Sequence, residues 1–279
     1  MTFATSATQI PLHASAVSLS VDSHDLAEKY DRLSNLQFEN GKRLAELLGV
    51  GSGARVLDIG AGTGRLAHHI AGLVGDPSLV AGIDPLPLRI ELAKSKLGLR
   101  TKLVVGRAED LSAFESETFD YAYFNAVYHW IPDQPAALRE AFRVLRKGGR
   151  LGFTTGDRDS QNSFQRISKK IAELPEFSEL GYREWLPYRV SPSILREQLE
   201  QAHFAPHILD VRHFVDYFES AEEVLHFNSS SSFGNFLSEV PNEKRQSFVT
   251  ALSGELEALR TPKGIALDRY TIFAVAAKS

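Results

Sequence analysis

The chain has 279 residues, of which 43% are hydrophobic and 24% are charged, as expected for a globular protein with one sizeable core. Its 31 Lys and Arg against 35 Asp and Glu give a net charge of −4, which disfavours nucleic acid as a partner because that partner requires a broad positive field. The chain contains no cysteine, which excludes disulfides, zinc–thiolate sites and cysteine nucleophiles.

No stretch of the sequence approaches 18 consecutive apolar residues, and residues 1–21 contain no Lys or Arg. We therefore expect neither a membrane-spanning helix nor a signal peptide, and we expect a cytoplasmic protein that has no membrane partner. The nine histidines show no metal-ligand spacing with a companion carboxylate, so no metal site is expected. The oligomeric state is left open.

Short apolar runs alternate with helical patterns from residue 55 onward. This alternation predicts a parallel sheet, because parallel strands are joined by crossover helices. Strands are expected at 55–59, 79–84, 102–105, 119–127, 150–155, 207–218 and 270–276. Helices are expected at 65–72, 88–97, 135–146, 164–174, 191–199, 220–227 and 241–260. The predicted fold is α/β, with a seven-stranded, mostly parallel sheet, helices on both faces and a small helical lid.

The same patterns divide the chain into core and lid segments. The core is expected at 49–156, with a continuation at 191–218 and a final strand within 263–279. The lid is expected to combine an N-terminal helical segment at 1–48, an insertion at 157–190 and helices at 219–262.

Three glycines follow the first expected strand, in Val56-Leu-Asp-Ile-Gly-Ala-Gly-Thr-Gly64. Glycine lets the backbone pass close to a ligand, and a strand-to-helix turn exposes unpaired N–H groups. Asp84 ends the second expected strand, where an acid can accept both hydroxyls of a ribose. Asp58 lies inside a buried strand, which is costly unless the acid is bonded. Together these features predict a cofactor site, against the alternative that the glycines only permit tight packing and Asp84 only caps a helix.

A dinucleotide fingerprint requires glycines at positions 60, 62 and 65, but position 65 is Arg65. This spacing disfavours a nicotinamide dinucleotide.

The motif 56–64 followed by Ile83-Asp84 resembles the first and second motifs of the class I S-adenosylmethionine-dependent methyltransferases. The resemblance is close over residues 50–156. The overall pattern is similar to the branch that includes quinone C-methyltransferases and the trans-aconitate, malonyl-carrier and juvenile hormone acid O-methyltransferases. It implies a Rossmann-like fold and S-adenosyl-L-methionine as the cofactor.

The resemblance also implies which residues hold that cofactor. In the family the glycine turn approaches the methionine part, the acid at the position of Asp84 holds the ribose, and the loop after the third strand holds the adenine. That loop is 106–110 here, with Arg107 where the family usually has an aspartate. A lid tyrosine closes over the cofactor in related enzymes, and Tyr30 is the candidate, although a core position is the alternative. The residues expected to bind the cofactor are Tyr30, Asp58, Gly60, Ala61, Gly62, Gly64, Asp84, Pro85, Arg89, Arg107, Ala108, Glu109, Asn125 and Ala126.

The segment after the fourth strand, Asn125-Ala-Val-Tyr-His-Trp130, is expected near the reacting methyl group, since ligands lie beyond the carboxyl ends of parallel strands. His129 is the candidate catalytic residue, because imidazole titrates near neutrality and could accept a proton. An equally weighted alternative is a packed histidine that only shapes the pocket. Substrate contacts are expected from Phe38, Tyr128, Trp130 and Trp185.

These expectations describe an S-adenosylmethionine-dependent methyltransferase of secondary metabolism that acts on a small, partly apolar molecule. Transfer to oxygen is slightly favoured over transfer to sulfur, nitrogen or carbon, since His129 could assist deprotonation. Two alternatives stay open: an NAD(P)-dependent oxidoreductase and a non-catalytic S-adenosylmethionine-binding module.

Overall fold

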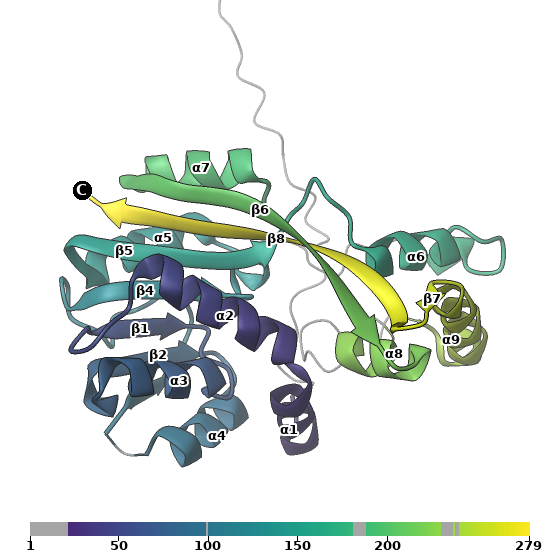
Figure 1. Cartoon of the computed structure of the whole chain (residues 1–279), viewed down its shortest axis with the longest axis horizontal. Helices are drawn as coiled ribbons and strands as arrows, with labels where there is room; N and C mark the ends of the chain where they lie inside the picture. The colour runs from purple at the N-terminus through teal and green to yellow at the C-terminus, as the bar shows by residue number, and fades with distance from the viewer. Residues whose placement is uncertain (1–21, 99, 181–187, 230–236, 238–239) are drawn as a thin grey trace, which may run out of the picture.

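The computed structural model describes residues 22–98, 100–180, 188–229, 237 and 240–279 (Figure 1). An eight-stranded sheet lies at its centre. The strands are β1 (Val56–Ile59), β2 (Val80–Asp84), β3 (Lys102–Val105), β4 (Phe119–Asn125), β5 (Leu145–Gly156), β6 (Phe204–Phe218), β7 (Arg260–Thr261) and β8 (Gly264–Lys278).

The strand order is β3-β2-β1-β4-β5-β8-β6, and β7 pairs with β8 off this path. Strands β1 to β5 pair in parallel, whereas β8 is antiparallel to both β5 and β6. The α/β fold and the mostly parallel sheet are therefore confirmed. The sheet has eight strands rather than seven because β7 is a two-residue strand at a tight turn, too short to show any periodicity in the sequence.

Helices cover both faces of the sheet (Figure 1). They are α1 (His24–Leu33), α2 (Asn35–Leu48), α3 (Arg65–Val74), α4 (Pro87–Leu97), α5 (Gln134–Val144), α6 (Ser163–Ala172), α7 (Pro192–Gln201), α8 (Ala221–Ser229) and α9 (Asn242–Glu257). Short 3₁₀ turns are η2 (Pro77–Leu79), η3 (Tyr128–Trp130) and η4 (Ser178–Leu180). Within the described ranges, no helix combines the length and the apolar composition needed to cross a bilayer.

Two buried clusters form the core, one on each face of the sheet. On one face, α2, α3 and α4 pack apolar side chains such as Leu44 and Ile70 against the strands. On the other face, α5 and α7 contribute side chains such as Leu138 and Leu195. Burial of these apolar helix side chains against the sheet holds the strands in place. The carboxyl ends of β1 to β4 therefore meet at one edge of the sheet.

A third cluster, which we call the lid cluster, lies beyond that edge. It joins apolar side chains of α6, α8 and α9 to Phe218 of β6 and to Leu267 of β8. The two strands reach it because they pair with each other from Phe204↔Lys278 to Phe218↔Ile265, whereas the pairing of β5 with β8 stops at Gly156↔Thr271. A two-stranded ribbon therefore connects the core to the lid cluster (Figure 1).

Candidate functional site

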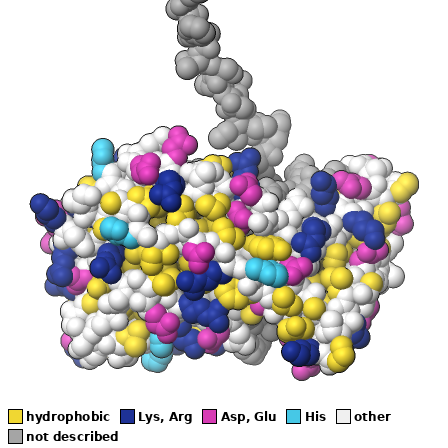
Figure 2. All heavy atoms as spheres, turned by 45° about the horizontal axis from the view of Figure 1, so that its top comes forward, with side chains coloured by type: hydrophobic (Ala, Val, Ile, Leu, Met, Phe, Trp, Pro, Cys, Tyr) yellow, Lys and Arg dark blue, Asp and Glu magenta, His cyan; other side chains and the backbone are white. Residues whose placement is uncertain are grey.

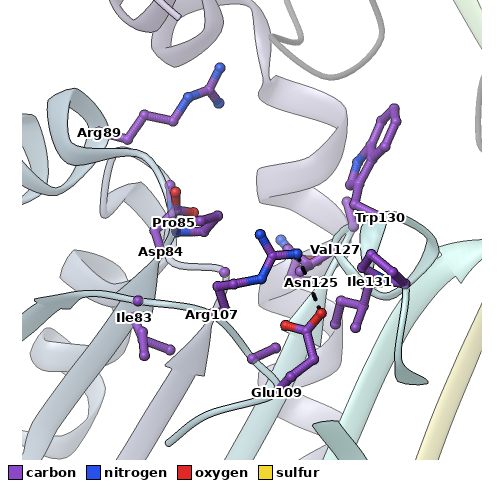
Figure 3. Close-up of a pocket in the computed structure, with 16 residues that line it drawn as sticks. Ile83, Asp84, Pro85, Arg89, Arg107, Glu109, Asn125, Val127, Trp130 and Ile131 are labelled. Carbon is purple, nitrogen blue, oxygen red and sulfur yellow. Dashed lines mark hydrogen bonds and ion pairs between the residues drawn. The ribbon is translucent and has the colours of Figure 1, made fainter. Parts of the chain in front are cut away.

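A cavity opens at the carboxyl ends of β1, β2, β3 and β4 (Figure 3). The space between its lining residues is about 780 Å³, including the part open to solvent at its mouth. Asp84 lies on one side, Trp130 lies on the other, and the ion pair of Arg107 with Glu109, 3.5 Å long, lies between them. The lining residues are Gly60, Gly62, Ile83, Asp84, Pro85, Arg89, Gly106, Arg107, Ala108, Glu109, Asn125, Ala126, Val127, Trp130, Ile131 and Pro132.

The three glycines of the turn have different roles, although all have positive φ. A Cβ atom added to Gly60 would lie 2.3 Å from a Cγ atom of Val127, and one added to Gly64 would lie 2.7 Å from Cβ of Ala93. A Cβ atom added to Gly62 would meet no atom within 4 Å. Gly60 and Gly64 therefore permit close packing of neighbouring elements, whereas Gly62 keeps a side of the cavity open. Gly64, predicted to bind the cofactor, lies at the N-terminus of α3 and lines neither this cavity nor the second cavity described below.

Asp84 is fixed at the base of the cavity by the backbone. One carboxylate oxygen accepts a hydrogen bond from N–H of Gly62 at 2.9 Å, and the other accepts from N–H of Leu86 at 3.0 Å. Burial raises the pKa of this carboxyl, while the two N–H donors and the nearby Arg89 oppose the rise. Two ionised oxygens offer about four acceptor positions, so this carboxylate can accept further hydrogen bonds from a ligand.

A second cavity of about 410 Å³ adjoins the first and shares Gly60, Gly62 and Asn125 with it. Asp58 of β1 lies in its wall, and burial raises the pKa of this carboxyl to about 7, with a further contribution from the charge of Asp84. The lining residues are Ser34, Gln37, Phe38, Asp58, Gly60, Ala61, Gly62, Thr63, Arg65, Leu66 and Asn125. Each of the two joined cavities thus has a buried carboxyl in its wall.

The raised pKa of Asp58 predicts a pH-dependent stability. An ordinary aspartate has a pKa of 3.8, so the unfolded chain releases a proton that the folded chain keeps up to a pH of about 7. The free energy of unfolding should therefore fall as pH rises from about 4 to 7, by an amount on the order of 4 kcal/mol. Denaturant unfolding of wild type and of Asp58→Asn across this window measures the effect. Parallel pH profiles for the two proteins would contradict it.

Helix α2 closes the second cavity. The main-chain carbonyl of Gln37 accepts a hydrogen bond from the Asn125 side chain at 3.1 Å, and Asn125 accepts one from the Thr154 hydroxyl at 2.6 Å. The side-chain oxygen of Gln37 is buried and accepts no hydrogen bond from the residues that the structure describes. An acceptor in this position suits a ligand that carries an N–H or O–H donor.

Helix α1 is attached to the glycine turn through Asp31. The Asp31 carboxylate accepts hydrogen bonds from the Thr63 hydroxyl and from Nζ of Lys96, each at 2.5 Å. Burial acts to raise the pKa of Asp31, but these two hydrogen bonds outweigh it and hold the pKa below its ordinary value. Arg65 donates to the main-chain oxygen of Asp31 at 3.2 Å. The predicted cofactor residue Tyr30 belongs to α1, but its side chain lies outside the described residues.

The segment after β4 places only part of the predicted reaction site at the cavity. Trp130 lines the first cavity. Tyr128 is buried against the rings of Phe124 and Phe153, and its hydroxyl donates to Gln198 at 2.9 Å. The structure therefore places Tyr128 in the core, where it lines neither cavity. Trp185 lies outside the described residues.

His129 is buried and also lines neither cavity. Its Nδ1 lies 2.9 Å from the Thr155 hydroxyl. Burial, with the nearby charge of Arg189 as a second cause, lowers the pKa of His129 to about 3. The imidazole is therefore neutral near pH 7, and this geometry favours the packed histidine over the catalytic base.

Of the other predicted residues, Phe38 and Ala61 line the second cavity. Pro85, Arg89, Arg107, Ala108, Glu109 and Ala126 line the first. Val127, Ile131 and Pro132 were not predicted from the sequence as site residues, although all three line the first cavity. Their position shortly after the fourth expected strand was the signal that could have identified them. Ser34, Gln37 and Arg65, which reach the site through the packing of α2 and α3, were not predicted either.

Residues 57–153 match a family model described as a methyltransferase domain. The chain is 36% identical over 132 residues to a demethylmenaquinone methyltransferase of Staphylococcus aureus, covering 45% of this chain and 54% of that protein. It is 36% identical over 112 residues to an arsenite methyltransferase of Mus musculus, covering 36% of this chain and 30% of that protein. The chain thus spans about half the length of the first relative and less than a third of the second.

Solved structures share the fold over most of the chain. The YcgJ protein of Bacillus subtilis aligns with a TM-score of 0.60 at 18% identity, covering 86% of this chain and 98% of that one. A geranyl diphosphate C-methyltransferase of Streptomyces coelicolor aligns with a TM-score of 0.53 at 15% identity, covering 95% and 87%. The segment that matches the family contains the glycine turn, Asp84 and the wall after β4. The chain therefore carries a methyltransferase domain of the class I, S-adenosylmethionine-dependent family.

Proposed function

We propose that this protein transfers the methyl group of S-adenosylmethionine to a small, partly apolar molecule. The observation that carries the proposal is the pair of joined cavities, which share an open glycine turn and hold the buried carboxyls of Asp84 and Asp58. The relatives named as a demethylmenaquinone methyltransferase and an arsenite methyltransferase support a small acceptor.

The charges of the site fit this cofactor. Asp84 in the first cavity suits the hydroxyls of a ribose. A sulfonium or ammonium group beside Asp58 in the second cavity would favour the ionised form of that carboxyl. In their ionised form, the two carboxyls would repel the pyrophosphate of a dinucleotide. N–H of Gly62, which a phosphate would use, already donates to Asp84. The side-chain oxygen of Gln37 adds an acceptor for the ammonium group.

S-Adenosylmethionine, when bound, supplies a methyl group that is already electrophilic. The tasks of the chain are then to align the acceptor atom and to exclude water. Val127, Trp130 and Ile131 present an apolar wall to the first cavity, which supports a partly apolar acceptor. The preference for oxygen depended on His129 as a base, and its burial away from both cavities withdraws that support. The proposal therefore covers an acceptor oxygen, sulfur, nitrogen or activated carbon.

Calorimetry and label transfer test the function. We expect S-adenosylmethionine and S-adenosylhomocysteine to bind and NADH not to bind. Incubation with S-adenosylmethionine that carries a labelled methyl group, in a small-molecule extract, should move the label into a metabolite. Binding of NADH alone would contradict the proposal, and binding of S-adenosylmethionine without transfer would identify a non-catalytic module.

Substitution of His129 should affect folding more than chemistry. His129→Ala removes the partner of the buried Thr155 hydroxyl, which should lower the free energy of unfolding by about 1–3 kcal/mol. The pH profile of kcat/KM should keep its shape, and its value should stay within about twofold, since His129 lines neither cavity and its pKa of about 3 makes it a weak base. Thr155→Val, which removes the other partner, is the matched control. A large loss of kcat in His129→Ala alone, at unchanged stability, would restore the catalytic role.

A further inference from the structure

The outer edge of β6 is a candidate interaction surface outside the methyltransferase site. β6 is the last strand of the sheet, and within the described part of the chain it pairs only with β8. Three alternating apolar side chains on this strand are exposed: Val211 by 36%, Val215 by 42% and Tyr217 by 48%. Figure 2, which brings the top of Figure 1 forward, shows hydrophobic side chains across the middle of this face, with lysine and arginine side chains among them.

Edge strands are usually protected from further pairing by lysine, proline or a bulge. In β6 the bulge and the single proline lie at Pro206–Ile208, and the strand then runs in regular register to Phe218. The strand contains no lysine. The segment from Ile208 to Phe218 therefore lacks these three protections, and no described strand pairs with its outer edge.

We propose that the protein forms a two-fold dimer in which Ile208–Phe214 pairs antiparallel with the same segment of a second copy, centred on Val211. In this register Val211 faces Val211 of the second copy, and Ile208 faces Phe214. Asp210 faces Arg212 of the second copy, twice. Opposite charges and apolar pairs placed directly across two strands stabilise a sheet.

The side chains at the centre are available for this pairing. Asp210 is 55% exposed at its side chain and accepts one hydrogen bond, from Nε of Arg212 at 3.1 Å. The Arg212 side chain is 33% exposed and its guanidinium lies over the Phe273 ring, 4.5 Å from the centroid. Within the described residues, its two terminal nitrogens donate no hydrogen bond. A second copy would place a further carboxylate beside each guanidinium.

Neighbouring registers are less favourable. A two-fold axis at Arg212 places two guanidinium groups opposite each other, and an axis at Asp210 places two carboxylates opposite each other. An axis at Phe214 pairs Arg212 with Asp216, but Asp216 already accepts two hydrogen bonds from Arg269, at 2.6 and 3.1 Å. Charge complementarity therefore favours the axis at Val211 over these three registers.

Disulfide trapping tests the register directly, because the chain has no cysteine of its own. Residues directly opposite in an antiparallel pair have Cα atoms about 4.5–5.5 Å apart, a separation that a disulfide spans. Mild oxidation of full-length Val211→Cys should give a species of twice the 30.9 kDa chain mass that reduction reverses.

Two matched variants show whether the crosslink is specific. Val215→Cys lies on the same strand but faces residue 207 in the proposed register. Val105→Cys replaces a valine that is 48% exposed on β3, the strand at the opposite edge of the sheet. Both should crosslink much more slowly. Failure of Val211→Cys to crosslink, or crosslinking no faster than in these two variants, would overturn the proposal.

Charge reversal provides a second measurement by sedimentation. Arg212→Asp places carboxylates opposite each other and should weaken dimerisation by at least about tenfold. The double variant Asp210→Arg/Arg212→Asp restores opposite charges across the axis and should recover dimerisation, whereas it would not do so in the register centred on Phe214. Thermal unfolding confirms that each variant is folded. A monomeric wild type at high protein concentration, or a double variant as weak as the single one, would overturn the proposal.

Discussion

Replacing Asp84 with alanine should weaken the binding of S-adenosylhomocysteine by about 2–4 kcal/mol, because the variant loses charge-assisted hydrogen bonds to the ribose hydroxyls. The dissociation constant, measured by calorimetry, should rise by a factor of roughly 30 to 1,000. The effect should be large because Asp84 is buried and already oriented by N–H of Gly62 and of Leu86, so that the carboxylate needs no reorganisation to accept a ligand.

Loss of the Asp84 carboxylate also removes the acceptor of two N–H groups, so the ligand-free protein should lose about 1–3 kcal/mol of unfolding free energy. Asp84→Asn has nearly the same shape and keeps one acceptor oxygen, which separates the loss of charge from the loss of structure. Asp110→Ala removes an exposed carboxylate of the loop after β3 that lines neither cavity and serves as the surface control. An unchanged dissociation constant in a folded Asp84→Ala protein would remove the cofactor assignment.

Replacing Gly60 with alanine should lower the free energy of unfolding by about 2–5 kcal/mol, measured by denaturant titration. A φ of +88° costs an alanine about 1–2 kcal/mol. The new Cβ would also lie 2.3 and 2.6 Å from the two Cγ atoms of Val127, and such overpacking costs about 1–3 kcal/mol. Since Val127 lines the first cavity, the displaced side chain should weaken ligand binding as well.

Gly75→Ala isolates the backbone contribution. Gly75 has a φ of +84° at the end of α3, and an added Cβ would meet only the Ser52 hydroxyl, at 4.0 Å. The free energy of unfolding of Gly75→Ala should therefore fall by only about 1–2 kcal/mol. The double variant Gly60→Ala/Val127→Ala removes both Cγ contacts and should recover part of the stability. Equal losses in Gly60→Ala and Gly75→Ala would show that packing against Val127 does not require glycine.

The sequence predicted those parts of the structure that depend on local pattern. The strands of the order β3-β2-β1-β4-β5-β8-β6 appear in the sequence as short apolar runs. The glycine turn appears as glycines between an expected strand and an expected helix. Asp84 was predictable because the carboxyl ends of parallel strands share one edge. The two-residue strand β7 was not predictable, since two residues cannot show alternation.

The orientation of side chains in one short segment was not predictable in the same way. Tyr128, His129 and Trp130 are consecutive, yet only Trp130 lines the first cavity. The 3₁₀ turn η3 decides this, because it directs Tyr128 toward the core and His129 toward Thr155. Gln37 lines the second cavity because α2 packs beside the glycine turn. A local sequence pattern does not predict how segments that are distant in the sequence pack together.

The ribbon of β6 and β8 has a mechanical consequence for the movement of the lid cluster. A loop between two domains acts as a hinge, but these two strands keep their paired register from the core to the lid cluster. Any displacement of the lid cluster relative to the core would therefore twist a hydrogen-bonded ribbon, and two-stranded ribbons take up extra twist readily. The energy stored in such a twist would act to return the lid cluster to its original position.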